Sequence, residues 1–381
     1  MNGLEQLRQA CQRDANNPEN WQQLGDAYVK QAMLQDASEC YRRLARLRPT
    51  ASSYCRLGRS QLLLVAPADA LPNLQKAREL DPHDPEVASA LGTAYLRARK
   101  WQEAKPLLAQ AAAADHNNEE AHMGLAKIAV IEGNHRRAVE LCNHVLKHNP
   151  IDALSPLALC GDCLIVLSAL PEAEKCYQTL VELAPANVAA KAGLAQVYIL
   201  QRRLDEANAL LAKAAKQDPT CPQVYLGYGN LASARGELVQ AQNCYQNSVL
   251  VDPTCVDGYA GLSSVLILQG KLESAAAVAQ QGLAVNPDHP SCLLCSAQAL
   301  ELQGKAGEAV KPAQRAVEIM PENFQAHLIL GRILLEIGKD LDAAAMQINQ
   351  ALTLSPEGKT RENIQHLKQS LEAYQQRQKT E

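Results

Sequence analysis

The sequence contains few aromatic side chains and no long apolar run. Only 4% of its 381 residues are aromatic, with a single phenylalanine and two tryptophans. No stretch approaches the roughly 18 uncharged apolar residues that a membrane-spanning helix needs. No segment shows the alternation of apolar and polar residues typical of a half-buried strand, and the N-terminal residues lack the apolar core of a signal peptide. We therefore expect a soluble, cytoplasmic, helical protein without a membrane partner.

Strong net charge and the usual marks of catalysis are also missing. The formal net charge is −4, which implies no general attraction to nucleic acid or to an anionic membrane. The basic run Arg42, Arg43, Arg46 and Arg48 has no interleaved aromatic residues, so it predicts a solvated helix face. No glycine-rich phosphate loop, nucleophile elbow or pair of catalytic carboxylates is present. We expect no enzyme, no cofactor and no nucleic-acid partner.

The segment Pro18–Thr50 organises the rest of the chain. It predicts two antiparallel helices, at about Pro18–Lys30 and Leu34–Leu47. Its apolar residues fall on one face of each helix, and two of its residues, Gly25 and Ala37, lack bulk, so the helices can approach closely. Such a pair cannot bury its apolar face alone and needs further copies beside it.

Those copies recur along the chain at a nearly constant spacing. The small residue that opens the second helix returns ten times, at spacings of 33 to 35, as Ala37, Ala70, Ala104, Ala138, Ala173, Ala207, Ala241, Ala275, Ala309 and Ala344. A proline closes nearly every unit, because proline cannot continue a helix. These prolines are Pro49, Pro82, Pro150, Pro185, Pro219, Pro253, Pro287, Pro321 and Pro356.

The first unit resembles the tetratricopeptide repeat, whose pattern is W-x2-L-G-x2-Y, then A-x3-F, then P. The matching residues are Trp21, Leu24, Gly25, Tyr28, Ala37, Tyr41 in place of Phe, and Pro49. The resemblance implies an all-α, right-handed α-solenoid of about ten helix-turn-helix repeats. We expect cap helices at 1–17 and 357–381, and repeats at 18–50, 51–84, 85–118, 119–153, 154–187, 188–221, 222–255, 256–289, 290–323 and 324–356.

The resemblance also implies that the first helix of each repeat lines a concave groove. By register, the candidate groove residues are Met123, Lys127, Ile131, Asp162, Val166, Gln196, Leu200, Leu226 and Asn230. Apolar members would anchor a ligand and polar members would set its register, whether a helix or an extended peptide. We therefore expect a non-enzymatic scaffold or adaptor that binds a polypeptide client. Chaperone-binding relatives carry lysine at the fifth position of the first helix, and no repeat here does.

Other functions remain alternatives. The chain could be a regulatory or targeting subunit of a separately encoded enzyme, or could self-associate through an apolar groove. It could also sense a metal through His144, His148 and Cys142, since i and i+4 histidines on a helix can share an ion. The twelve cysteines recur at fixed helical positions and predict packing residues rather than disulfides or metal ligands.

One glycine departs from the helical pattern. Gly282 lies inside the expected second helix of the eighth repeat. Glycine in a helix interior costs roughly 1 kcal/mol relative to alanine. We expect this helix to be the internal helix least protected from amide exchange.

Overall fold

The structure is a computed structural model, and it describes residues 3–64, 67–148, 150–338, 340–355 and 358–380. Within those ranges all regular elements are α-helices, and no helix there is long and apolar enough to span a bilayer. The chain divides into two compact units, Met1–Cys163 and Leu164–Glu381. Each unit is described below by itself.

The first unit holds the helices up to the start of α10, which crosses the boundary between the units. These helices are α1 (Gly3–Arg13), α2 (Pro18–Lys30), α3 (Leu34–Leu47), α4 (Ala51–Leu63), α5 (Pro67–Leu80), α6 (Pro85–Arg97), α7 (Trp101–Ala114), α8 (Glu119–Ile131), α9 (His135–Lys147) and α10 (Leu154–Val166).

The second unit holds the remaining helices. They are α11 (Leu170–Leu183), α12 (Val188–Leu200), α13 (Leu204–Gln217), α14 (Pro222–Arg235), α15 (Leu238–Val251), α16 (Val256–Leu268), α17 (Leu272–Val285), α18 (Pro290–Leu302), α19 (Ala306–Ile319), α20 (Phe324–Ile337), α21 (Leu341–Leu354) and α22 (Lys359–Thr380). We call the even-numbered helices α2–α20 the A helices and the odd-numbered helices α3–α21 the B helices.

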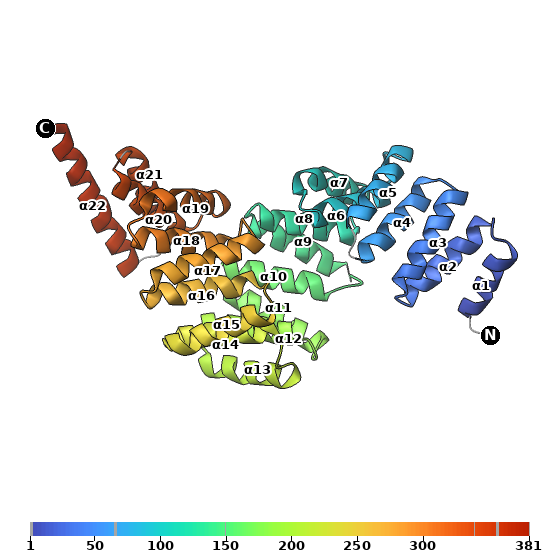
Figure 1. Ribbon diagram of the computed structural model, residues 1–381, viewed down its shortest axis with the longest axis horizontal. Helices are drawn as coiled ribbons and strands as arrows, with labels where there is room; N and C mark the ends of the chain where they lie inside the picture. The colour runs from blue at the N-terminus through green and yellow to red at the C-terminus, as the bar shows by residue number, and fades with distance from the viewer. Residues whose placement is uncertain (1–2, 65–66, 149, 339, 356–357, 381) are drawn as a thin grey trace. The chain divides into compact units, whose positions relative to one another are not determined.

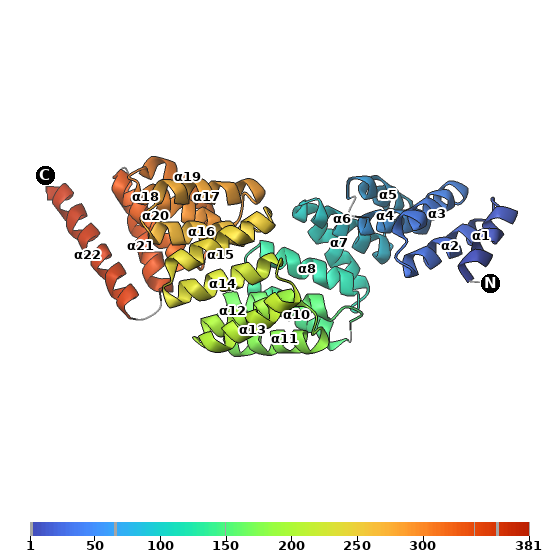
Figure 2. The same cartoon turned by 60° about the horizontal axis from the view of Figure 1, so that its bottom comes forward.

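Within each unit the helices stack in chain order (Figures 1 and 2). Most helices pack against the next one along the chain, so A helices such as α2, α4 and α6 each pack against the B helix that follows. Successive A helices also touch one another, as α4 does with α6 and α6 with α8 in the first unit, and α12 with α14 and α14 with α16 in the second. The A helices therefore form one layer of each stack.

The contact between an A helix and its B helix depends on small residues. The alanine that opens each B helix is fully buried in all ten pairs, from Ala37 to Ala344. On the A side, a Cβ built on Gly25 would lie 2.7 Å from Cε1 of Tyr41, inside van der Waals distance. The close approach that Gly25 and Ala37 predict is present, and a larger side chain at either residue would separate the helices.

The turn from A helix to B helix uses the left-handed backbone conformation. At the second or third residue before the B helix, φ is positive at Gly133, Gly236, Gly270, Gly304 and Gly338. In four other turns the same place is taken by Ala32, Arg99, Ser168 and Arg202, with φ between 57° and 64°. For a residue with a Cβ, that conformation costs roughly 1–2 kcal/mol. Because the local backbone energy opposes these four turns, the packing of the flanking helices must hold them.

Helix starts follow ordinary capping chemistry. Asp84 precedes α6, and its Oδ1 accepts hydrogen bonds from the backbone N–H groups of Glu86 at 2.8 Å and Val87 at 3.3 Å. Pro85 then takes the first helical position, where its missing N–H costs nothing. Asn118 caps α8 and Asn187 caps α12 in the same way.

The first and last described helices cover the ends of the stacks. Cys11 of α1 is buried in one cluster with Leu24 and Tyr28 of α2. Ile364 and Leu371 of α22 are buried in one cluster with Ile348 of α21. We propose that α1 and α22 are cap helices and that each A/B pair between them is one repeat, with the boundaries given above.

Candidate functional site

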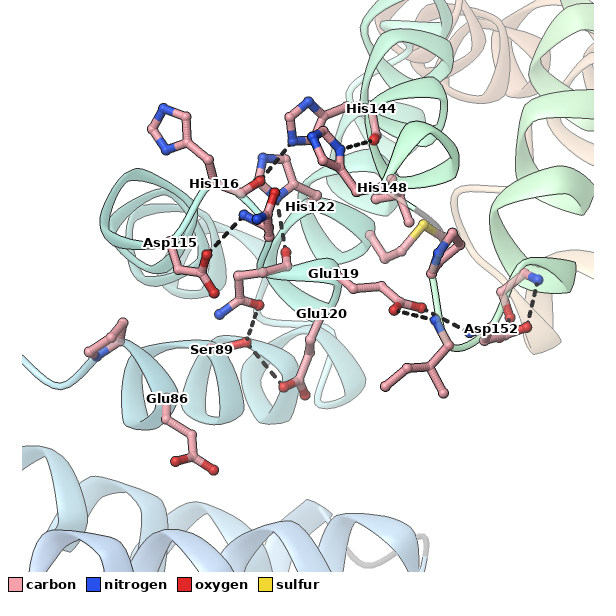
Figure 3. A pocket seen from close by; sticks show the side chains of 18 of the residues that line it. Glu86, Ser89, Asp115, His116, Glu119, Glu120, His122, His144, His148 and Asp152 are labelled. Atoms are coloured by element: carbon pink, nitrogen blue, oxygen red, sulfur yellow. Dashed lines mark hydrogen bonds between the residues drawn. The ribbon is translucent and has the colours of Figure 1, made fainter.

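A pocket of about 870 Å³ opens on the A-helix layer of the first unit. Its walls come from α4, α6, α8 and α9, from the segment 115–118 before α8, and from the segment 150–152 before α10. Figure 3 shows the side chains that line it. Residues far apart in the sequence meet here because the repeat places successive A helices side by side.

Arg59 ties three A helices together at one side of the pocket. Its guanidinium, on α4, donates to Glu86 on α6 at 2.9 Å and to Glu120 on α8 at 2.6 Å. The buried hydroxyl of Ser89 donates to the same Glu120 carboxylate at 3.1 Å. Burial opposes the charge of Arg59, but Glu120 and the other neighbours outweigh it and raise the pKa of Arg59. The two carboxylates therefore hold this cation in place.

Three histidine rings lie in a row at another side of the pocket (Figure 3), with His122 and His144 stacked and His148 tilted by 47° from His144. The ring centroids of His122 and His144 are 4.4 Å apart with an interplanar angle of 26°, and those of His144 and His148 are 4.6 Å apart. We call His122, His144 and His148 the histidine stack. Burial lowers the pKa of His122, and the nearby imidazoles of His144 and His116 lower it further.

The hydrogen bonds of the histidine stack assign the protons of its rings. His122 Nδ1 bonds to the carbonyl oxygen of Asn118 at 2.9 Å, His144 Nε2 to that of His116 at 2.7 Å, and His148 Nδ1 to that of His144 at 2.8 Å. A carbonyl oxygen only accepts, so each of these nitrogens carries a proton. In the neutral rings the other nitrogen, His122 Nε2, His144 Nδ1 and His148 Nε2, keeps its lone pair.

The segment before α10 completes the pocket. Glu119 accepts hydrogen bonds from the backbone N–H groups of Ile151 at 3.1 Å and Asp152 at 3.3 Å. Asp152 in turn caps α10 by accepting from the N–H of Leu154 at 2.9 Å. The hydroxyl of Ser155 lowers the pKa of Asp152 most, and the charge of Lys127 adds to that effect. The Ile151 side chain is held at the rim, fully exposed at 102%.

The candidate groove residues of the first unit lie at different depths. Met123 is 9% exposed and Lys127 is exposed, and both line the pocket. Ile131, at the end of α8, keeps 45% of its surface exposed, and Asp162 on α10 is exposed. Met123 therefore offers little apolar area to a ligand, while Ile131 offers much more.

In the second unit, the exposed apolar candidates form a regular series. Val166 and Leu200, each at the last residue of its A helix, are 61% and 43% exposed. The same helical position is occupied by Leu268 and Leu302, which are 64% and 46% exposed. We call Val166, Leu200, Leu268 and Leu302 the apolar row. Leu226, by contrast, is half-buried against the cluster that contains Leu262 of α16.

The polar candidates of the second unit bond to each other. Asn230 Nδ2 on α14 donates to Gln196 Oε1 on α12 at 2.7 Å. The hydroxyl of Tyr245, from the B helix α15, donates to Asn230 Oδ1 at 2.6 Å. Gln196 and Asn230 are thus held by hydrogen bonds, and Gln196 lies one turn before Leu200 of the apolar row.

Metal binding gains no support from the geometry. No group of three or more histidine, cysteine, aspartate or glutamate side chains suited to a metal ion occurs in the described ranges. Cys142, which a sensor with His144 and His148 would use, has no exposed surface. All twelve cysteines lie in the described part of the chain, and none of them forms a disulfide. Burial raises the pKa of Cys292 to about 12, so such thiols behave as packing groups.

Two arginines of the basic run at the end of α3 form ion pairs with different carboxylates. Arg42 pairs with Glu39 on its own helix. Arg48 Nη1 donates to Glu19 at 2.9 Å and Arg48 Nη2 to Gln22 at 2.8 Å, both on α2. Arg42 and Arg48 of the run are therefore each paired with a carboxylate.

Sequence reasoning missed the pocket itself. Arg59 and Glu120 are 61 positions apart, and nothing in either repeat marks them as partners. Two signals were present: the fourth repeat is rich in histidine, and one extra residue precedes the fifth repeat. That extra length belongs to the segment that carries Ile151 and Asp152 to the rim.

Comparison with known families identifies the class of protein. Two descriptions of the tetratricopeptide repeat match residues 23–85 and 66–128. The chain is a tetratricopeptide-repeat protein, and its units are all-α solenoids of that type. A family described as the cilia and flagella-associated protein 70 C-terminal domain matches residues 153–369, which is more than half of the 381 residues. The chain belongs to that family.

Individual relatives match only in part. The chain is 28% identical over 158 residues to protein O-mannosyl-transferase Tmtc3 of Drosophila melanogaster, covering 40% of this chain and 16% of that protein. It is 23% identical over 187 residues to human tetratricopeptide repeat protein 21B, covering 49% of this chain and 14% of that protein. The chain thus spans less than a fifth of the length of these curated relatives.

A solved structure has a similar fold. The crystal structure of yeast Tom70 matches with a TM-score of 0.50 and 13% sequence identity, covering 98% of this chain and 92% of that chain. At this identity the likeness concerns the fold alone. A tetratricopeptide fold is consistent with a protein-interaction scaffold.

Proposed function

We propose that this protein is a non-enzymatic scaffold or adaptor that binds a polypeptide segment along its A helices. The observation that carries the proposal is the apolar row of the second unit. Val166, Leu200, Leu268 and Leu302 recur at one helical position and keep 43% to 64% of their surface exposed. Repeated exposed apolar side chains on a folded chain favour an interaction site.

The spacing of the row suggests how a ligand would lie. Neighbouring helices pack about 8–10 Å apart. That distance corresponds to about three residues of an extended chain, or about two turns of a helix. A ligand with apolar side chains at such intervals would bury the row, and it would pass Ala234 of α14 between Leu200 and Leu268. Gln196 and Asn230, fixed by their mutual hydrogen bond, would pair with polar groups of the ligand and set its register.

Leu200→Glu tests the proposal, with Leu183→Glu as its matched control. Leu183 ends the B helix α11 and is 58% exposed, so both changes put one carboxylate on an exposed helix end of the same unit. Peptides selected from a random display library on the wild-type chain would be titrated against both variants by fluorescence anisotropy. Burying the exposed half of a leucine contributes about 1 kcal/mol, and the new charge adds to that loss. We expect Leu200→Glu to weaken binding about tenfold or more.

Leu183→Glu should leave the affinity unchanged. Circular dichroism would confirm that both variants keep their helices. Selected peptides that bind both variants as tightly as the wild type would contradict binding at the apolar row. A library that yields no peptide for the wild-type chain would contradict it as well.

A further inference from the structure

The pocket of the first unit has more acceptors than donors. Its lining includes the carboxylates of Glu86, Asp115, Glu119, Glu120 and Asp152, against the cations Arg59 and Lys127. Arg59 is already held by Glu86 and Glu120, and the charge of Lys127 acts on Asp152. With neutral histidines the formal charge of the lining is −3, from two cations and five carboxylates. An anionic ligand would meet net repulsion there.

The histidine stack adds neutral acceptors to this excess. Each of its rings donates one N–H to a backbone carbonyl, which leaves one nitrogen lone pair on His122, His144 and His148. All three rings line the pocket (Figure 3). Together with the carboxylates, these nitrogens favour a ligand group that is cationic and carries several N–H donors. Arginine and lysine side chains are the groups of polypeptides with that chemistry.

Apolar contacts at the same rim suit the rest of such a side chain. The exposed Ile151 lines the pocket, and the methylene groups of arginine or lysine can cover apolar surface while the charged head contacts acceptors. We propose that this pocket binds an arginine or lysine side chain of a partner polypeptide while the histidine stack is neutral. This site goes beyond the apolar row, because it lies in the other unit and uses charge rather than apolar burial.

The proposal fixes the sign of its pH dependence. A histidine that gains a proton adds positive charge beside the bound cation, so acidification weakens binding. The charged groups around the stack are Asp115 and His116 before α8, Glu119, Glu120 and Lys127 on α8, and Asp152 before α10. Histidine is the side chain whose charge ordinarily changes between about pH 5 and 8. Between about pH 5.5 and 8 the change therefore comes from the histidines.

The test uses the full chain and two small probes. Acetyl-Ala-Arg-Ala-amide carries the cation, and the same tripeptide with citrulline keeps the shape without the charge. Binding would be followed by the imidazole Hε1 resonances of the nine histidines, assigned by single substitutions. At about pH 8 we expect the arginine peptide to shift the resonances of the stack and to bind about tenfold or more tightly than the citrulline peptide. At about pH 5.5 its affinity should fall by a similar factor.

Three variants test the role of the stack. His148→Lys places a permanent cation beside the site and should abolish binding of the arginine peptide at both pH values. His366→Lys makes the same change on an exposed residue of α22, outside the pocket, and should have no effect. His148→Gln cannot be protonated; we expect it to keep the affinity at about pH 8 within a few-fold and to reduce the loss on acidification.

Several results would overturn the proposal. Equal affinity for the arginine and citrulline peptides would show that charge does not direct binding. An affinity that is unchanged between the two pH values, or a His366→Lys variant as weak as His148→Lys, would remove the histidine stack from the site. Absence of any shift with the arginine peptide in the wild-type chain would refute the site altogether. None of these results bears on the apolar row, whose variants lie in the second unit.

Discussion

Replacing Gly58 by alanine should destabilise the first unit, although alanine is the better helix former. Gly58 lies inside α4, and a Cβ built on it would be 2.4 Å from Cγ of Leu74 and 2.7 Å from its Cδ2. Leu74 on α5 has no exposed surface, and Cγ is a branch point rather than a flexible end, so it cannot move aside. The two helices would have to separate.

The expected magnitude is a difference between two terms. Alanine gains roughly 0.5–1 kcal/mol over glycine in a helix. Forcing an extra methyl group into a close-packed core costs roughly 1–3 kcal/mol, and a separation of 2.4 Å puts this contact at the costly end. We expect Gly58→Ala to lower the free energy of unfolding by about 2 kcal/mol.

Gly307→Ala is the matched control. Gly307 also lies in a helix, α19, but a Cβ there meets nothing within 4 Å. It should therefore stabilise the chain by up to about 1 kcal/mol. The same substitution should therefore change the free energy of unfolding in opposite directions at the two glycines. Helix propensity alone would predict the same direction at both.

The assay is urea unfolding followed by circular dichroism, together with amide exchange of α4 and α5, because a solenoid can open locally. A second substitution isolates the contact. Leu74→Ala alone should cost about 2–5 kcal/mol, and about 1 kcal/mol less in the Gly58→Ala background, where it relieves the clash. If Gly58→Ala stabilises the chain as Gly307→Ala does, the close-packing argument is refuted.

Three further predictions concern backbone, thiols and a buried ion pair. Ala32→Gly relieves a positive φ of 57° and should raise the midpoint of thermal unfolding, gaining about 0.5–1 kcal/mol; a lower midpoint would contradict the strain. Burial raises the pKa of Cys55 and of Cys292 to about 12, so their contribution to stability is complete below about pH 9 and is lost as pH rises toward 12. Thermal unfolding at about pH 7 and 10.5 checks this, and equal midpoints would refute it. Arg332→Ala leaves the buried carboxylate of Glu301 without its 2.6 Å partner and should cost about 1–3 kcal/mol in urea unfolding at pH 7. That loss should shrink as pH falls and Glu301 protonates, whereas a loss independent of pH would contradict it.

Much of the helical packing could be predicted from the sequence because it repeats. A residue such as Ala37 that recurs at one phase of a 34-residue unit must serve the contact that every unit makes, and its burial follows. The same holds for Gly25, whose missing side chain admits the ring of Tyr41. Local capping signals such as Asp84-Pro85 predict helix starts because the backbone N–H groups that the cap binds lie within three residues of it.

Other features could not be predicted because they depend on partners outside the repeat. Gly282 appeared only to weaken its helix, but a Cβ there would lie 2.6 Å from Sγ of Cys292 on α18 and 3.0 Å from Cβ of Tyr259 on α16. Glycine at this residue therefore permits the packing of three helices. Whether α17 is also the internal helix that exchanges its amides fastest stays a prediction. The burial of Met123 could not be predicted either. Its position in the repeat shows only that it lies on an A helix, not how deeply its neighbours cover it.

The two proposed sites use the same property of the repeat in different ways. The A helices lie side by side, so Asn230 contacts Gln196 at the equivalent position of the preceding A helix at 2.7 Å, and Arg59 contacts Glu86 and Glu120 near the starts of the next two A helices. In both cases a polar side chain already forms hydrogen bonds to another A helix in the absence of a ligand. Such groups are held in place without further loss of conformational entropy, which favours selectivity. Affinity must then come from groups that remain available to a ligand: the exposed leucine and valine side chains in the second unit, and the remaining lone pairs of carboxylates and imidazoles in the first.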